Sequence, residues 1–211
     1  MKKKNMIIIT LLLSIVAISL GVSVAVFNYF GAGTTNNVIE TGRIIFSYSD
    51  AELGSDSGNG INITNAMPTP DTDGKLLSSP KEYFDFSVTA STTSTDIAYE
   101  ISAIKLDKST MDEDNVKIYL TELVGVNQEK ETEITGGDTT PTYKELKTTN
   151  NPLLTGKSLY FGTVKAGEVA YGKKFRLRMW IKYPDNEDIN YEEINEKMFK
   201  VKVNVAAVAS N

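Results

Sequence analysis

Apolar and polar residues alternate along two segments near the C-terminal end of this chain. Every second side chain is apolar in residues 175–183 (FRLRMWIKY), and residues 199–205 (FKVKVNV) repeat the pattern. A period of two places one set of side chains on one face of an extended strand and the other set on the opposite face. Each segment is therefore predicted to be a β-strand with its apolar face buried and its polar face in solvent.

Further strand candidates precede these two segments and are separated by stretches rich in Gly, Pro, Asp and Asn, which favour turns. The candidates are residues 43–48, 60–64, 84–90, 97–103, 116–121 and 158–164. About eight strands with one polar face each predict an all-β fold, an antiparallel two-sheet sandwich of jelly-roll-like type. Residues 128–151, charged and rich in Thr, are predicted to form a loop or an edge hairpin, and residues 191–197 a short helix.

The first 25 residues have the pattern of an export signal. Lys2, Lys3 and Lys4 precede a run from residue 6 to residue 27 without a charged side chain, and Ser23-Val24-Ala25 resembles a processing site. We expect residues 1–25 to be a signal peptide that signal peptidase removes. The alternative is an uncleaved membrane anchor, because the run is long enough to cross a bilayer as a helix. Both interpretations place the remainder outside the cell, secreted or associated with the cell surface.

The processed chain is divided into two parts: an extended segment, 26–40, and a β-sandwich domain, 41–211. Removing residues 1–25 takes away three of the 22 basic residues and none of the 27 acidic ones, so the net charge changes from −5 to about −8. Nucleic acid binding needs clustered basic residues. The acidic net charge therefore predicts that nucleic acid is not a partner of this chain.

Composition also limits the chemistry that the chain can perform. It has no His and no Cys, which excludes His-dependent triads, thiol nucleophiles and the usual zinc ligands. We therefore expect a protein that is not an enzyme and has no cofactor.

Three groups of carboxylates are candidate sites. Residues 112–114 (DED) and the acids at 185, 187 and 188 leave a paired-carboxylate glycosidase as an alternative, but acidic runs beside strands are usually solvated turns. Residues 71–74 (DTDG) resemble the first half of a calcium loop, yet the later acidic ligands are missing. We predict a turn there and no metal site.

Trp180 is the only tryptophan and lies on the face opposite Leu177. It shares this face with Arg176 and Arg178, so the three residues form a candidate ligand face on which a sugar ring would stack. The favoured interpretation is that Trp180 packs under a loop or against the neighbouring sheet edge, with Arg176 or Arg178 stacked on it. Because this face is predicted to be solvated, Arg178→Asp should destabilise the fold less than Leu177→Asp.

Several short motifs together resemble the TasA/camelysin family of secreted biofilm-matrix fibre proteins. They are residues 25–30 (AVFNYF), 34–37 (TTNN), 41–46 (TGRIIF), 84–88 (FDFSV) and 165–168 (KAGE), which follow a charged start and an apolar run. The resemblance implies a jelly-roll domain that supplies extracellular fibres to biofilms. It also implies an aromatic pair soon after the processing site.

Two functions follow from these observations. The first is a structural protein of the bacterial cell surface or extracellular matrix, self-assembling into a homopolymer through an N-terminal donor strand that contains Val26, Phe27, Tyr29 and Phe30. The alternative is a monomeric surface-anchored adhesion module that recognises glycan or protein. Residues 26–40 discriminate them: a donor segment should be detached and extended, whereas in a module it should belong to its own sandwich or to a stalk.

Overall fold

A computed structural model describes residues 28–31, 37–41, 44–50, 60–64, 66–79, 82–128, 130–137, 139–184 and 194–210. For residues 28–31, 37–41, 44–50 and 210 the description concerns the backbone alone. Among the described residues, no helix has the length and apolar character needed to cross a membrane. The predicted signal peptide, residues 1–25, lies outside the described residues.

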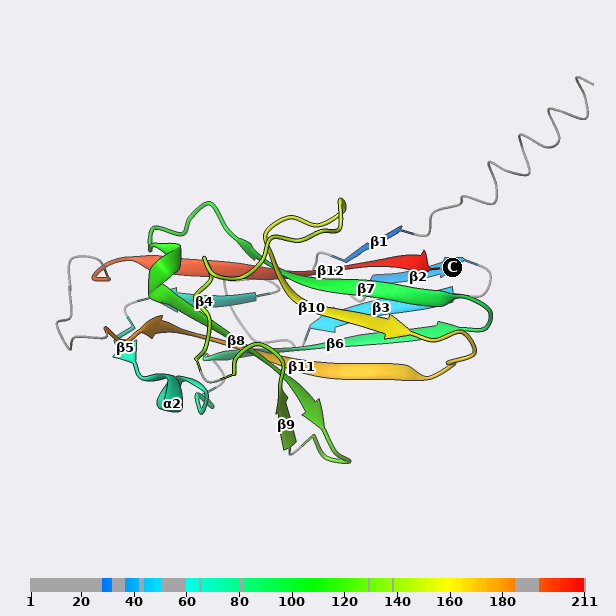
Figure 1. The fold of residues 1–211 in the computed structure, drawn as a ribbon, viewed down its shortest axis with the longest axis horizontal. Helices are drawn as coiled ribbons and strands as arrows, with labels where there is room; N and C mark the ends of the chain where they lie inside the picture. The colour runs from blue at the N-terminus through cyan, green and yellow to red at the C-terminus, as the bar shows by residue number, and fades with distance from the viewer. Residues whose placement is uncertain are drawn as a thin grey trace, which may run out of the picture.

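The described chain forms two sheets that pack face to face (Figure 1). Sheet A contains β1 (Asn28–Gly31), β4 (Gly60–Thr64), β7 (Asp96–Lys105), β10 (Lys157–Val164) and β12 (Met198–Ser210). Sheet B contains β2 (Asn37–Thr41), β3 (Ile44–Asp50), β5 (Pro68–Thr69), β6 (Tyr83–Thr92), β8 (Val116–Val124), β9 (Lys130–Glu133) and β11 (Tyr171–Lys182). The helical elements within the described residues are α2 (Asp71–Gly74) and the 3-10 turn η1 (Glu113–Asn115).

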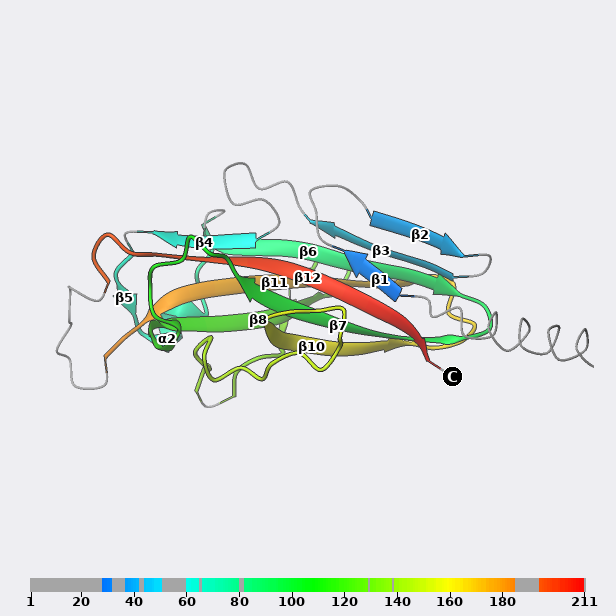
Figure 2. The same cartoon turned by 90° about the horizontal axis from the view of Figure 1, so that it is seen from above.

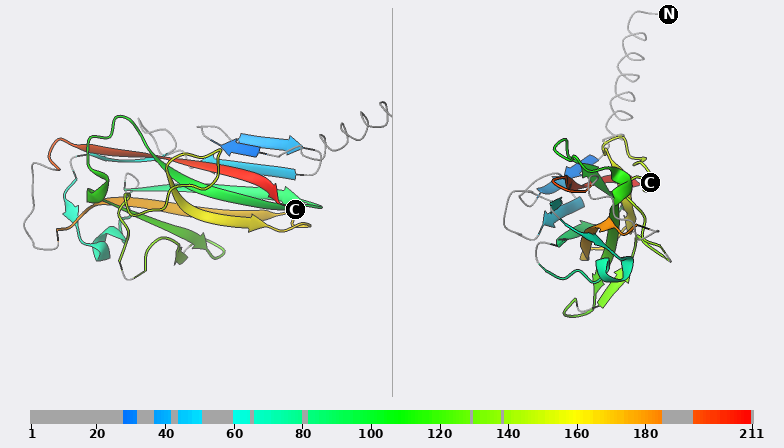
Figure 3. Two further views of the ribbon diagram at one scale, coloured as in Figure 1. Left: turned by 45° about the horizontal axis from the view of Figure 1, so that its top comes forward. Right: turned by 90° about the vertical axis from the view of Figure 1, so that its left-hand side faces the viewer.

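Strand order follows from the pairing of strands that are far apart in sequence. Sheet A runs β1-β12-β7-β10, with β4 also paired to β12, and sheet B runs β2-β3-β6-β11-β8-β9, with β5 also paired to β11. The short β5 pairs with β11 in parallel, and the other pairings are antiparallel. The prediction of an all-β sandwich is confirmed, and Figure 3 shows the two sheets as separate layers.

The core lies between the sheets and contains the apolar sets predicted from the alternation. Phe86 of β6 and Phe175 of β11 are almost fully buried, and their ring centroids lie 5.3 Å apart. Leu177 of β11 and Val203 of β12 are 0% exposed. A strand's apolar face packs against the opposite sheet because each Å² of apolar surface removed from water stabilises the fold by roughly 25 cal/mol.

The polar faces differ from the prediction, because several of them are also buried. Lys117, Thr121 and Arg178 on sheet B, and Glu100 and Ser102 on sheet A, are at most 9% exposed. The cause is that the connections fold back over the outer faces. Figure 1 shows α2 and the β9 hairpin on the outer side of sheet B.

Two smaller predictions have different outcomes. The edge hairpin expected within residues 128–151 is confirmed, since β9 pairs with β8 at the edge of sheet B. The short helix expected at 191–197 is not borne out in the described part of that segment, where residues 194–196 form a turn. Residues 191–193 are outside the described residues.

Candidate assembly edge and covered polar face

The candidate donor segment contains β1, which lies at the edge of sheet A. Its register on β12 is antiparallel, with Tyr29 opposite Ala207 and Phe30 opposite Ala206. Strand β4 pairs with the earlier part of β12, from Met198 to Lys202. Two short strands therefore lie one after the other along the same edge of β12 (Figure 2). Val26 and Phe27 lie outside the described residues.

The rest of the described donor segment belongs to the other sheet. Residues 37–40 are part of β2, which pairs with β3 at the edge of sheet B. In this single chain, the described parts of 26–40 thus extend both sheets of their own sandwich, and a detached segment is not what the structure shows. The backbone reason is that edge strands β12 and β3 present unpaired N–H and C=O groups that a neighbouring strand satisfies.

Trp180 of the candidate ligand face is buried beneath α2. Its side chain is 2% exposed, and its indole Nε1 donates a hydrogen bond of 3.2 Å to Asp71 Oδ1. A Cβ added at Gly74 would lie 2.3 Å from the indole ring, so the helix backbone rests directly on it. The Tyr119 ring meets the indole edge-on at a centroid distance of 6.2 Å. Trp180 is thus buried, as the favoured interpretation expected, but beneath a short helix instead of a loop, and its ring is not open to a sugar.

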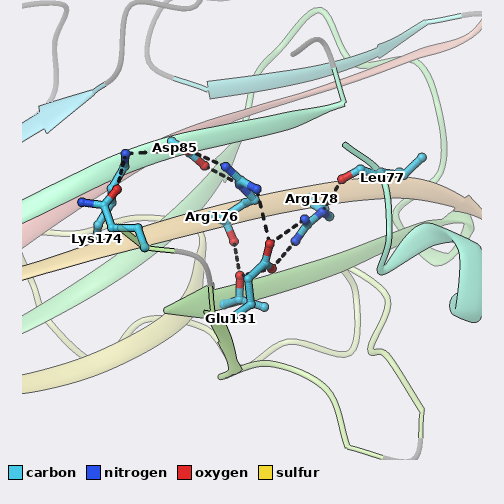
Figure 4. A network of polar contacts seen from close by, with 8 residues as sticks. Leu77, Asp85, Glu131, Lys174, Arg176 and Arg178 are labelled. Atoms are coloured by element: carbon cyan, nitrogen blue, oxygen red, sulfur yellow. Dashed lines mark hydrogen bonds and ion pairs between the residues drawn. The ribbon is translucent and has the colours of Figure 1, made fainter. Parts of the chain in front are cut away.

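The two arginines of this face form an ion-pair network instead of stacking on Trp180 (Figure 4). Arg178 donates two hydrogen bonds to the Glu131 carboxylate, at 2.6 and 2.9 Å, and a third to the carbonyl of Leu77 at 2.6 Å. Arg176 donates two bonds to Asp85, at 2.7 and 2.9 Å, and one to Glu131 at 3.3 Å. Such paired, charge-assisted bonds are the strong ones. They tie the β9 hairpin and the loop before β6 to β11.

The electrostatic consequence of the network is clearest at Glu131. Hydrogen bonds from Arg178 are the main cause that lowers the pKa of this carboxyl below its usual value. Arg176 stacks on the Tyr83 ring, with 4.0 Å between the guanidinium carbon and the ring centroid. The expectation of an arginine stacked on Trp180 was therefore wrong, because Arg178 is held by Glu131 and Arg176 by Asp85 and the Tyr83 ring.

The other carboxylate groups are also occupied. Asp71 in the calcium-like segment accepts from the backbone N–H of Thr140 at 3.1 Å as well as from Trp180. In the acidic segment 112–114, Glu113 pairs with Lys105 at 3.2 Å and Asp114 pairs with Lys144. An open groove of about 760 Å³ borders this segment. The described residues contain no group of three His, Cys, Asp or Glu suited to a metal, and residues 185, 187 and 188 are outside them.

Two polar clusters, one partly and one fully buried, are not indicated by the sequence pattern. In the first, Tyr99 Oη lies 2.6 Å from Tyr171 Oη, and Lys173 bonds to both Tyr160 and Glu122, at 3.2 and 2.7 Å. Burial raises the pKa of Tyr99 and of Tyr171 above the usual tyrosine value. The second cluster contains Glu100, Ser102 and Asn204, which lie on the polar faces of β7 and β12 and are buried. Alternation alone assigned Glu100, Ser102 and Asn204 to the solvated face.

Comparison with known proteins does not assign this chain to a family. No protein-family model and no curated protein sequence matches it. A search of solved structures gives the infectious bursal disease virus VP2 subviral particle, at 10% identity and TM-score 0.29, covering 88% of this chain and 33% of that one. It also gives the GH31 alpha-xylosidase from Xanthomonas citri, at 7% identity and TM-score 0.20, covering 87% of this chain and 20% of that one. This chain thus spans a third or less of either protein, and such low scores carry no argument about function. The resemblance to the TasA/camelysin family stays a prediction.

Proposed function

We propose that this chain is an exported structural protein of the bacterial cell exterior that assembles with copies of itself, with residues 26–40 donated as a strand to the neighbouring subunit. The observation that carries the proposal is the position of β1. It is four residues long, lies at the sheet edge and pairs with β12 close to the end of the described chain. Removal of residues 1–25 would leave β1 two residues from the new N-terminus, and a short edge strand near a chain terminus is the element most easily exchanged between copies.

Exchange of β1 conserves the interactions that hold it. A β1 strand from another copy can make the same register on residues Val205 to Val208 of β12 that the chain's own strand makes. The backbone hydrogen bonds are therefore equal in number in the closed and exchanged forms, and protein concentration decides between them. Phe27, Tyr29 and Phe30 would add roughly 1.5–3 kcal/mol each wherever they are buried.

The geometry of exchange favours a filament. A chain that gives its strand to the next subunit and receives one from the previous subunit makes a head-to-tail contact that does not close on itself. The resemblance to a family of matrix fibre proteins supports the same conclusion. The acidic charge of the chain, −5 with the first 25 residues included, keeps such subunits soluble before assembly.

The alternative function, a monomeric adhesion module for glycan or protein, is favoured by a different observation. Both β1 and β2 complete their own sandwich, which is the arrangement expected of a module. A pocket of about 440 Å³ between β4 and β11 offers a binding place, and Met67 on its border is 58% exposed. In this case residues 27–30 would continue a membrane anchor at the interface, where aromatic side chains are common.

Electron microscopy of the exported protein over a range of concentration and pH separates the two functions. Mass measurement first establishes the N-terminus, with Ala25 expected as the last residue removed; a surface form that keeps Met1 supports the anchor. Filaments should form from the processed protein. A form lacking residues 26–33 should remain a folded monomer at every concentration.

Point variants make the test specific to the segment. Phe30→Asp places a charge in β1 and should abolish filaments while the monomer stays folded. Val126→Asp is the matched control, because Val126 is 98% exposed in a turn far from β1 and should not affect assembly. Filaments formed without residues 26–33 would contradict the donor-strand proposal.

A further inference from the structure

Three buried oxygen atoms on the outer face of sheet A lack a hydrogen-bond partner. They are Glu100 Oε1, Ser102 Oγ and Asn204 Oδ1, and their residues are 2%, 0% and 2% exposed. Unsatisfied polar atoms at such depth destabilise the folded state and are rare in folded proteins. Three of them in one place therefore call for a bound species that the protein chain does not itself supply.

The sheet register brings the three residues together. Asn204 of β12 lies directly opposite Ser102 of β7, and Glu100 precedes Ser102 by two residues, so it lies opposite Ala206. Directly opposed Cβ atoms are about 4.5–5.5 Å apart, and side chains two residues apart on one strand are about 7 Å apart on the same face. One small ion can therefore contact all three side chains.

The loop of residues 149–156 covers this place. The backbone N–H of Asn151 donates a hydrogen bond of 3.2 Å to Glu100 Oε2, and Leu154 is 5% exposed. A Cβ at Gly156 would lie 2.2 Å from the carbonyl oxygen of Ala103, so the loop backbone runs directly against β7. The loop satisfies one oxygen of Glu100 and leaves the other, Oε1, buried without a hydrogen-bond partner.

Charge and ligand chemistry identify the species. Among the described residues, no Lys or Arg forms an ion pair with Glu100, and a buried carboxylate without a counter-charge is strongly unfavourable. Carboxylate, hydroxyl and amide oxygens are the ligands that hard cations take. A cation would supply the missing charge and satisfy the three unpaired acceptors together.

We propose that Glu100, Ser102 and Asn204 bind one monovalent cation of the sodium type beneath the 149–156 loop. A single positive charge neutralises the single carboxylate, whereas calcium would leave one positive charge uncompensated in a buried place. The bound ion joins β7, β12 and the loop, so it stabilises the sandwich independently of any assembly function.

Thermal unfolding of the full chain in a neutral detergent tests the proposal. The melting temperature is measured in NaCl and in choline chloride at equal ionic strength, so that general screening is the same in both salts. At a sodium concentration ten times Kd, linkage predicts a rise of about 3–6 °C relative to choline. Line broadening of the ²³Na NMR signal by the wild-type protein gives a direct measure of binding.

Variants of the cluster give the decisive comparison. Glu100→Gln should lose both the sodium-dependent rise and the ²³Na broadening, and should melt no lower than wild type in choline chloride, because the buried charge is gone. Ser102→Ala should weaken the sodium-dependent rise in melting temperature several-fold, although the Glu100 carboxylate is still present. Glu122→Gln, which alters a carboxylate paired with Lys173 on sheet B, is the control and should keep the full response.

Three outcomes would overturn the proposal. They are equal melting temperatures in the two salts together with no ²³Na broadening, a Glu100→Gln protein that responds to sodium like wild type, and a response to CaCl₂ without one to NaCl. The NMR measurement uses the wild-type chain alone, so the proposal can be rejected even if a variant fails to fold.

Discussion

Reversing the charge at Arg178 should destabilise the sandwich strongly, although the residue lies on a strand face predicted to be solvated. Arg178 is 4% exposed and makes three hydrogen bonds, two of them to Glu131. Arg178→Asp removes all three and places a second carboxylate beside Glu131. Breaking a buried ion pair by removing one partner costs about 3–5 kcal/mol. Because the Glu131 side chain is 30% exposed, we take the lower end of that range, about 3 kcal/mol.

This loss is large compared with a total stability of about 5–15 kcal/mol. For a domain of this size it corresponds to a fall in melting temperature of about 6–12 °C, measured by circular dichroism. Lys108→Asp is the matched control, since Lys108 is exposed in a turn and should change stability by less than about 0.5 kcal/mol. If both variants melt together with wild type, the network of Figure 4 does not hold β9 to the sheet.

The ion pair between Arg178 and Glu131 should also affect how the free energy of unfolding changes at acidic pH. The folded-state pKa of Glu131 is lowered, chiefly by hydrogen bonds from Arg178, so its contribution is complete above the unfolded pKa of about 4.3. The contribution is lost as the pH falls through the lower folded pKa. The free energy of unfolding should therefore fall less steeply with acid in Arg178→Asp than in wild type. An identical slope would refute the assignment.

Two further predictions concern the core and the alkaline limit. Leu177→Asp and Val203→Asp should each unfold the domain, because an unpaired charge would stand at a 0% exposed position and cost several kcal/mol; a melt at the wild-type temperature would contradict the face assignment. Burial raises the pKa of Tyr143 to about 12, so its stabilising contribution is complete below the unfolded value of about 10 and is lost as the pH rises toward 12. Unfolding free energies measured between pH 9 and 12 should fall less steeply in Tyr143→Phe, and an unchanged slope would count against this origin.

Local alternation was enough to locate the main strands and their inner faces. Segments 84–90, 97–103, 116–121 and 199–205 lie in strands, as do residues 175–182, and their apolar sets face the core. Tyr183 follows the end of β11 and is 39% exposed. The reason is geometric: side chains of an extended chain point to alternate faces, and only one face of each strand can be buried against the opposite sheet. The predicted end of the signal peptide at Ala25 also depends on local sequence alone.

The covering of the outer faces depended on contacts between distant parts of the chain, which no local pattern records. Glu131 reaches Arg178 across 47 residues, and Asp71 reaches Trp180 across 109. Polar side chains at alternate positions look the same in sequence whether water or a returning loop faces them, since either can satisfy their charges and hydrogen bonds. The folded path of the loops decides that Trp180 and Arg178 are buried. The pairing of β7 with β12 decides that Glu100, Ser102 and Asn204 lie on neighbouring strands of one face.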